Sequence, residues 1–228
     1  MTDAVTRLNP YAAWRRLPYV KSPIIIQVGA RTGGVTIAFK NIWPDGIVYC
    51  FEPLPSGFNV LRERFRGVGS VIPINKAVAD KEGRVVINVN HMEGTSSVLN
   101  INQESPYFRY PYIVKRTVDV EAVTVDGFCS RHGIEAVNLL MIDVQGFELW
   151  VLRGAVKMLR RHAIKAVFTE VYFVDLYEGV PLFDTVKQAM EDIGYRFENL
   201  YNIGRWADRE TGLPMWADAM FICDQEVK

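Results

Sequence analysis

The sequence predicts an α/β protein with a doubly wound, mostly parallel, Rossmann-like sheet that includes an antiparallel C-terminal strand. Apolar runs of strand length alternate with amphipathic helical segments along the chain. A glycine-bearing turn joins the first apolar run to the first helix, and acidic residues follow several of the runs. The last two runs, residues 195–201 and 217–223, have no helix between them, so we expect them to pair antiparallel.

The elements of the first half follow from periodicity and turn residues. Ser56 is the expected N-cap of the second helix. Residues 91–114 are polar and aromatic without periodicity, and an irregular stretch of this length is usually functional. In chain order we expect a short lead-in helix at 11–16, a strand at 24–28, a helix at 35–42, a strand at 47–51, a helix at 56–66, a strand at 71–74, a loop at 75–80, a hairpin turn at 81–83 and a strand at 84–89.

The second half continues the alternation of strands and helices. Gly133 and Gly194 are the expected stops of two helices. In chain order we expect a half-exposed strand at 118–125, a helix at 126–132, a buried strand at 137–142, a helix at 147–161, a strand at 163–169 and a helix at 183–193. We divide the chain into a lead-in, residues 1–23, and one domain, residues 24–228.

The composition is that of an ordinary globular protein, with 49% hydrophobic and 23% charged residues. Lys and Arg balance Asp and Glu at 26 each, which argues against a nucleic-acid-binding protein. No apolar run reaches the ~18 residues of a membrane span, so we expect a cytoplasmic protein without a membrane partner. The three cysteines and three histidines are dispersed, which argues against a disulfide framework or a zinc site.

Three predicted strands end in carboxylates, namely Glu52, Asp143 and Glu170. Open α/β sheets bind ligands outside the carboxyl ends of their strands. The turn that starts at Gly29 spells neither G-x-G-x-x-G nor a P-loop, so it does not predict a pyrophosphate site. A cofactor with a ribose and no phosphate, such as S-adenosylmethionine, fits this turn. Its ribose would lie on Glu52 and its amino-acid end over Gly29 to Gly33.

Four segments resemble the FkbM-type S-adenosylmethionine-dependent methyltransferases, which have the class I methyltransferase fold. Residues 27–33 resemble the family's D-V-G-A-N-x-G, and residues 51–55 match its F-E-P-x-P. Residues 139–148 resemble its L-K-I-D-V-E-G-x-E, and residues 216–221 resemble its closing strand. The resemblance implies O-methylation of a hydroxyl on a sugar or secondary metabolite, with a small molecule as the acceptor.

Three residues depart from the family pattern: Gln27 replaces Asp, Arg31 replaces Asn, and Gln145 replaces Glu. The family's Asp would help to hold the ammonium group of the cofactor. A glutamine can still form hydrogen bonds but contributes no charge, so Asp143 is the alternative contact for that ammonium group.

The resemblance and the strand ends together give the candidate site. Asn75 and Ala77 follow the third strand, where class I folds place the adenine. Three roles are open for Asp143: orienting the cofactor, binding Mg²⁺ together with Glu170, or acting as a general base. His91 is a second candidate base toward an acceptor hydroxyl. The candidate cofactor-binding residues are Gln27, Gly29, Arg31, Gly33, Glu52, Asn75, Ala77 and Asp143.

Other functions remain open at this stage. An N-methyltransferase or a protein methyltransferase would use the same fold with different acceptor loops. A cofactor-binding module without turnover is kept open by Gln27 and Gln145. The glycine spacing disfavours a nicotinamide-dependent dehydrogenase. The sequence also leaves open whether the protein forms a homo-oligomer.

Overall fold

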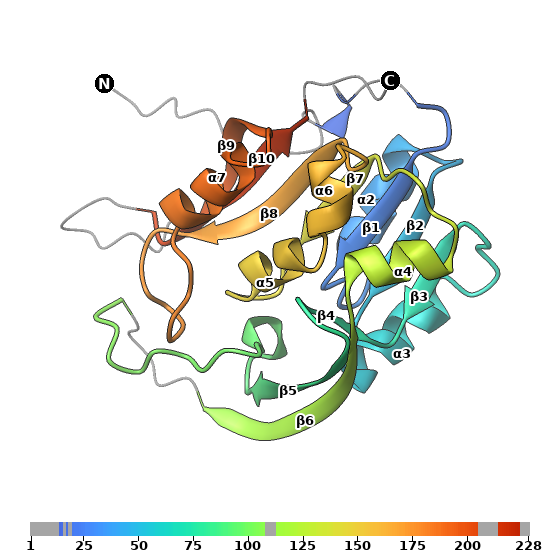
Figure 1. Cartoon of the computed structure of the whole chain (residues 1–228). Helices are drawn as coiled ribbons and strands as arrows, with labels where there is room; N and C mark the ends of the chain where they lie inside the picture. The colour runs from blue at the N-terminus through green and yellow to red at the C-terminus, as the bar shows by residue number, and fades with distance from the viewer. Residues whose placement is uncertain (1–13, 16, 18–19, 108–112, 205–213, 224–228) are drawn as a thin grey trace, which may run out of the picture.

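The computed structural model describes residues 14–15, 17, 20–107, 113–204 and 214–223 (Figure 1). A seven-stranded sheet has the strand order β3-β2-β1-β7-β8-β10-β9, and a smaller sheet has the order β4-β6-β5. The strands of the large sheet are β1 (Ile24–Val28), β2 (Ile47–Phe51), β3 (Val71–Ile74), β7 (Leu139–Ile142), β8 (Ala166–Tyr172), β9 (Arg196–Gly204) and β10 (Trp216–Ile222).

The pairing of these strands confirms the predicted fold class. Strand β1 pairs in parallel with β2 and with β7, and β7 pairs in parallel with β8. Strand β10 is antiparallel to both β8 and β9, as expected for the last two apolar runs. Because β1, β2 and β7 are parallel neighbours, their carboxyl ends lie at one edge of the sheet.

Helices cover both faces of the large sheet. Side chains of β1 alternate between the faces, because Ile25 joins a cluster with α2 and α3 whereas Ile26 joins a cluster with α4 to α7. The helices are α2 (Gly34–Ile42), α3 (Pro55–Arg64), α4 (Val125–Arg131), α5 (Glu148–Arg153), α6 (Val156–Arg160) and α7 (Phe183–Glu191), and η1 (Glu93–Thr95) is a single turn of 3-10 helix.

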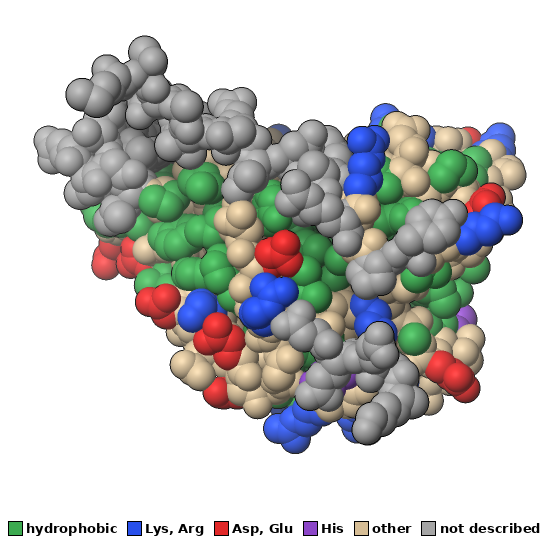
Figure 2. All heavy atoms as spheres, turned by 90° about the horizontal axis from the view of Figure 1, so that it is seen from above, with side chains coloured by type: hydrophobic (Ala, Val, Ile, Leu, Met, Phe, Trp, Pro, Cys, Tyr) green, Lys and Arg blue, Asp and Glu red, His purple; other side chains and the backbone are tan. Residues whose placement is uncertain are grey.

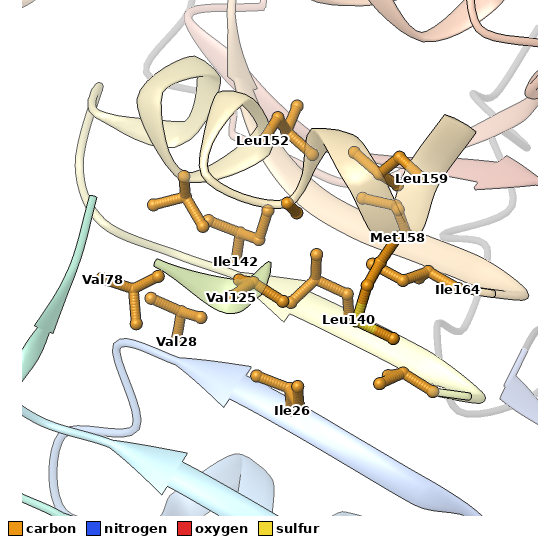
Figure 3. Close-up of a cluster of buried hydrophobic side chains, with 14 of the residues drawn as sticks. Ile26, Val28, Val78, Val125, Leu140, Ile142, Leu152, Met158, Leu159 and Ile164 are labelled. Carbon is orange, nitrogen blue, oxygen red and sulfur yellow. The ribbon is translucent and has the colours of Figure 1, made fainter. Parts of the chain in front are cut away.

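The core under α5 and α6 is built from the strand side chains that face these helices (Figure 3). Leu140 and Ile142 of β7 are at most 1% exposed, and they lie beneath Leu152 and Leu159. Burying a side chain of this size contributes about 1.5–3 kcal/mol each. This packing fixes β7, and therefore the position of the residue that follows it, Asp143.

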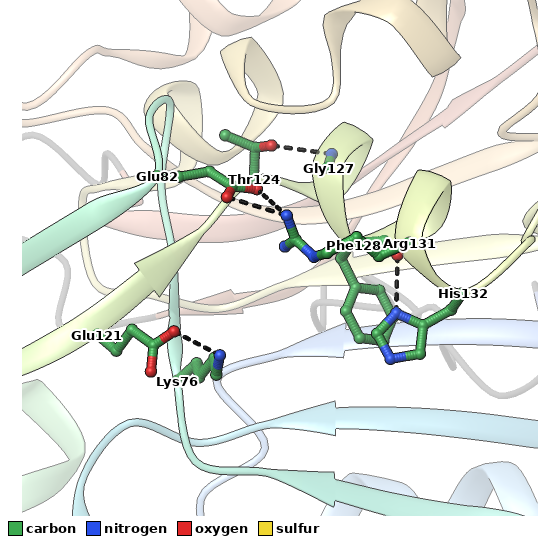
Figure 4. Close-up of polar contacts among 8 residues, drawn as sticks. All are labelled: Lys76, Glu82, Glu121, Thr124, Gly127, Phe128, Arg131 and His132. Carbon is green, nitrogen blue, oxygen red and sulfur yellow. Dashed lines mark hydrogen bonds and ion pairs between the residues drawn. The ribbon is translucent and has the colours of Figure 1, made fainter.

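The small sheet consists of β4 (Ala77–Val78), β5 (Gly83–Asn90) and β6 (Val114–Val123). In Figure 1 it lies below the large sheet, on the side toward which β1 points. Three ion pairs lie on it: Arg84 with Asp119 between β5 and β6, and Lys76 with Glu121 and Arg131 of α4 with Glu82, of which Figure 4 draws the last two. The Thr124 hydroxyl accepts a hydrogen bond from Gly127 N at 2.9 Å and so caps α4.

Some predicted elements differ from the observed ones. The helix expected at 147–161 is two helices, and Gly154 is the C-cap of the first. A Cβ on Gly154 would lie 2.1 Å from the carbonyl oxygen of Ala79, so this position needs a glycine. The helix expected from Ser56 begins at Pro55, which is favoured at a first helical position. The loop expected at 75–80 contains β4.

Glu170 was placed at a strand end by the sequence, and this was wrong. Strand β8 extends to Tyr172 and is buried along its whole length, so Glu170 lies inside it. The lead-in helix expected at 11–16 lies mostly outside the described residues. Of that segment, Trp14 is described as buried against Phe39 and Phe168.

The surface carries both signs of charge. Figure 2 shows acidic and basic side chains interspersed among hydrophobic ones on the face seen from above. Among the helices that the structure describes, none is long and apolar enough to cross a membrane.

Candidate active site

A cleft opens at the carboxyl edge of the large sheet, where the small sheet and η1 face it. It encloses about 860 Å³, part of which is open to solvent. One wall comes from the turns after β1, β2 and β7, and the opposite wall comes from β4, β5 and η1. Its lining includes Gly29, Arg31, Glu52, Leu54, Gly57, Lys76, Ala77, Val78, Ile87, Glu93, Gly94, Val98, Asp143, Gln145 and Phe147.

The turn after β1 requires a glycine at its first position. Gly29 has a φ of 85°, and a Cβ there would lie 1.9 Å from the carbonyl oxygen of Asp143. The amides of Gly29 and Ala30 both donate to Phe51 O, at 3.0 and 2.9 Å. The turn therefore presents bare backbone to the cleft and is locked to the ends of β2 and β7.

The Glu52 carboxylate follows β2 and is held by backbone. Its Oε2 accepts from Arg31 N at 2.8 Å, and its Oε1 accepts from Leu54 N at 2.9 Å. Gly57 leaves room for it, because a Cβ there would lie 3.0 Å from the Glu52 Cγ. Burial raises the pKa of Glu52, and the two backbone hydrogen bonds oppose this shift.

The Asp143 carboxylate follows β7 and lies among other acids. One nitrogen, Gln145 Nε2, donates to Asp143 Oδ1 at 2.8 Å and to Glu170 Oε2 at 2.9 Å. The Tyr172 hydroxyl also donates to Glu170 Oε2. Burial raises the pKa of Asp143, and the hydrogen bond from Gln145 and the charge of Arg31 oppose this shift. Burial and then the charge of Asp143 raise the pKa of Glu170 well above its usual range.

Glu148 is a buried acid beneath the same loop. Its Oε1 accepts from Val144 N at 3.0 Å and from Gly146 N at 3.2 Å, so it holds the turn in shape. Burial raises the pKa of Glu148 to about 8; these hydrogen bonds oppose the shift, and the charge of Asp143 adds to it.

A Mg²⁺ site at Asp143 and Glu170 finds no support. Across the described parts of the chain, no group of three or more His, Cys, Asp or Glu side chains is arranged to hold a metal ion. The Gln145 amide lies between the two carboxylates that a metal would have to bridge.

Five of the residues predicted for the site line the cleft: Gly29, Arg31, Glu52, Ala77 and Asp143. The structure thus brings together the turn after β1, the ends of β2 and β7, and the segment after β3. The segment expected to be functional at 91–114 contributes η1 and the residues after it to the opposite wall.

The other four predicted residues are not among those that the structure places in the lining. Gln27 is 1% exposed, and its Oε1 accepts from the Thr36 hydroxyl at 2.7 Å. Gly33, with a φ of 84°, packs toward Leu61 and Phe65. Gln27 and Gly33 therefore contact the core on the side of the β1 turn that faces away from the cleft.

Asn75 and His91 also lie outside the lining. The Asn75 side chain donates to the carbonyl oxygens of Glu52 and Pro53, at 2.9 and 3.0 Å. His91 follows β5, and its backbone amide donates to Ile113 O at 3.1 Å. Asn75 thus fixes the backbone that carries the Glu52 carboxylate.

The apolar part of the lining was not predicted. It includes Leu54, Val78, Ile87, Val98 and Phe147, which come from five separate segments. The Phe147 ring stacks on Trp150, with 4.8 Å between centroids and 3° between planes. Such a wall suits a flat apolar ring. The segments converge only through the two-sheet arrangement, which left no local signal in the sequence.

Comparisons with known proteins agree with this architecture. A family model described as the methyltransferase FkbM domain matches residues 27–197. The 2-O-methyltransferase NoeI of Sinorhizobium fredii is 25% identical over 163 residues, which cover 69% of this chain and 66% of NoeI. This chain therefore spans slightly less than two thirds of that relative.

Two solved structures share the fold. Methyltransferase FkbM from Methylobacillus flagellatus has a TM-score of 0.58 at 14% identity, covering 91% of this chain and 45% of that one. Fibrillarin from Aeropyrum pernix, solved with natively bound S-adenosyl-L-methionine, has a TM-score of 0.50 at 14% identity, covering 93% and 73%.

Proposed function

This chain belongs to the methyltransferase FkbM domain family, and from that premise we propose that it transfers a methyl group from S-adenosylmethionine to a hydroxyl oxygen of a small molecule, such as a sugar. The observation that carries the proposal is the Glu52 carboxylate, with each oxygen fixed by one backbone N–H at the end of β2. A relative named as a 2-O-methyltransferase supports oxygen as the acceptor atom.

The residues of the cleft fit the cofactor. Each Glu52 oxygen can accept a further hydrogen bond, so the carboxylate can accept from both hydroxyls of a ribose. The bare backbone at Gly29 allows the amino-acid end of the cofactor to approach closely. Ala77 and the apolar wall with Val78 and Phe147 would enclose the adenine.

The bound cofactor supplies a methyl group on a positively charged sulfur, which is already activated for displacement. Asp143 would orient the acceptor hydroxyl and accept its proton while the hydroxyl oxygen bonds to the methyl carbon and the bond from that carbon to sulfur breaks, its electron pair staying on the sulfur. Burial raises the pKa of Asp143, which makes this carboxylate a better base near neutral pH. We assign the base to Asp143 rather than to His91, because Asp143 lines the cleft.

Calorimetry tests the cofactor part of the proposal. Purified protein should bind S-adenosylmethionine and its demethylated product, S-adenosylhomocysteine. An absence of binding to both would remove the methyltransferase proposal.

The acceptor class needs a separate experiment. Protein incubated with methyl-labelled cofactor and a deproteinised small-molecule extract should transfer label to a small molecule by an alkali-stable ether bond. A parallel incubation replaces the small-molecule extract with a protein extract. Label found only on those proteins, or on nitrogen, would replace the O-methyltransferase proposal with one of the two other classes. Cofactor binding without labelling of any acceptor would favour a binding module.

A further inference from the structure

The Arg31 side chain is a cation in the cleft that forms no ion pair with any described residue. Its backbone N–H is used by Glu52, but none of the ion pairs and side-chain hydrogen bonds of the described chain involves its guanidinium group. The other cation in the lining, Lys76, is paired with Glu121 (Figure 4).

The guanidinium group crosses the cleft and lies against η1. A Cβ on Gly94 would be 2.6 Å from Arg31 Nη2 and 3.0 Å from Nη1, so only a glycine allows this approach without moving the arginine. Arg31 itself has a φ of 49°, a left-handed backbone that few side chains favour. The turn therefore holds a large basic side chain in a strained backbone position at the mouth of the cleft.

The acids of the cleft are already engaged elsewhere. Glu52 accepts two backbone hydrogen bonds, Asp143 accepts from Gln145, and Glu93 accepts from the Ser56 hydroxyl at 3.2 Å. The guanidinium group is still close enough to lower the pKa of Glu52 and of Asp143, although burial outweighs it at both. The guanidinium donors of Arg31, a lining residue, therefore remain available to a ligand in the cleft.

A guanidinium group binds a carboxylate through two parallel N–H···O bonds. We propose that Arg31 is a carboxylate-binding group of the cleft, which grips an acid group of a bound ligand. The inference rests on the proposed function for its two sources of carboxylate: the amino-acid end of the cofactor or an acidic acceptor such as a uronic acid. The family pattern has Asn at this position, so the contact would be a feature of this chain.

The test compares two nucleosides that differ in the amino-acid end. S-adenosylhomocysteine carries a carboxylate, and 5′-methylthioadenosine has the same nucleoside and sulfur without it. Arg31→Asn removes the charge and suits the left-handed backbone, so the variant should fold at least as well. If the cofactor is the source, Arg31→Asn should bind S-adenosylhomocysteine roughly tenfold or more weakly by calorimetry, and methylthioadenosine as the wild type does.

The acceptor arm uses protein saturated with S-adenosylhomocysteine. If an acidic acceptor is the source, the wild type should bind glucuronate more tightly than glucose, and Arg31→Asn should lose that preference. The inference is overturned if Arg31→Asn matches the wild type for both nucleosides and for glucuronate. Wild-type protein that binds neither nucleoside would instead remove the proposed function and the inference with it.

Two further variants separate geometry from charge. Arg31→Lys keeps the charge and loses the planar fork, and Gly94→Ala displaces the guanidinium group and keeps the charge. Both variants should bind more weakly the same carboxylate ligand, S-adenosylhomocysteine or glucuronate, that Arg31→Asn binds more weakly. Arg84→Asn is the matched control, because Arg84 pairs with the exposed Asp119 outside the lining. If Arg84→Asn lost as much affinity for the carboxylate ligand as Arg31→Asn does, the effect would be one of overall charge, and the inference would be overturned.

Discussion

The two carboxylates at the carboxyl edge of the large sheet, Glu52 and Asp143, have opposite surroundings. Glu52 is bound by backbone N–H groups of Arg31 and Leu54. Asp143 shares the Gln145 amide with a second buried acid, Glu170. Backbone N–H groups hold the Glu52 carboxylate in position. A side-chain amide that is shared with another acid holds the Asp143 carboxylate.

This difference separates two tasks. Backbone donors cannot titrate or change rotamer, so Glu52 remains a fixed acceptor suited to binding. Around Asp143, burial raises the pKa of Glu148 to about 8, and burial raises the pKa of Asp218 to about 7, with the charge of Asp143 adding to both shifts. A group that must accept a proton benefits from a raised pKa, and burial raises the pKa of Asp143 itself.

Gly29→Ala should have the largest effect, because Gly29 joins the two regions. The new Cβ would lie 1.9 Å from a backbone oxygen of Asp143, at a φ of 85°. We expect a loss of about 3 kcal/mol or more in the free energy of unfolding, measured with urea. Gly34→Ala is the control: beyond its neighbours and the helix backbone, no atom of the described residues lies within 4 Å of the new Cβ, and α2 should gain up to about 1 kcal/mol. Equal stability of Gly29→Ala and wild type would disprove the close approach.

The pH dependence of stability should come from the Asp143 side. The folded protein holds a proton on Glu148 up to about pH 8, whereas the unfolded chain releases it near the ordinary value of 4.5. This contribution to stability is therefore fully present below about pH 4.5 and is lost as the pH rises to 8.

Glu148→Gln cannot titrate, so its unfolding free energy should fall less than that of the wild type between pH 6 and pH 8, by about 2 kcal/mol. Urea titrations at pH 5, 6, 7 and 8 measure this difference. Glu191→Gln, at an exposed acid paired with Lys187, should keep the wild-type slope. Identical slopes for Glu148→Gln and wild type would mean that Glu148 is ionised in the fold.

The sequence predicted the strand ends well because they depend on local signals. The apolar runs before Glu52 and Asp143 stop at those residues, and each acid follows a strand as expected. Glu170 was misplaced because Thr169 and Glu170 look like the polar end of a strand. Strand β8 is covered on both faces, so it accommodates a buried acid bonded to Tyr172 and Gln145.

The opposite wall could not be predicted because it depends on contacts between distant segments. Strand β4 has only two residues, and η1 has three. Thr95 of η1 accepts a hydrogen bond from the Tyr177 hydroxyl, 82 residues away. For Gln27 the local motif was misleading. The motif predicted a contact with the cofactor, whereas the Gln27 side chain accepts a hydrogen bond from the Thr36 hydroxyl beneath the turn.

Glu52→Gln should affect binding more than folding. The amide would place an N–H donor against a backbone N–H and would lose one acceptor for the ribose. We expect the affinity for 5′-methylthioadenosine to fall roughly tenfold, about 1.4 kcal/mol, by calorimetry. Glu63→Gln, on the exposed side of α3 and paired with Arg66, should bind as the wild type does. Unchanged affinity of Glu52→Gln would remove the ribose contact from the proposal.

The smallest expected effect tests whether the Asp143 side is fixed by its side-chain network. The single proton of the Tyr177 hydroxyl is shared between two acceptors, Gln145 Oε1 at 3.1 Å and Thr95 O at 3.2 Å, so the hydroxyl orients the amide that donates to Asp143. Tyr177→Phe should cost about 1 kcal/mol of unfolding free energy. Tyr49→Phe is the control, because no described residue bonds its hydroxyl, and it should stay within about 0.5 kcal/mol of the wild type.

A binding measurement adds the decisive comparison for Tyr177→Phe. Nucleoside affinity depends on Glu52 and its backbone donors, so Tyr177→Phe should bind 5′-methylthioadenosine as the wild type does. If the nucleoside affinity of Tyr177→Phe fell together with its stability, Glu52 and Asp143 would be coupled through η1. The proposed separation, in which backbone groups fix Glu52 for binding and side chains fix Asp143 for reaction, would then be wrong.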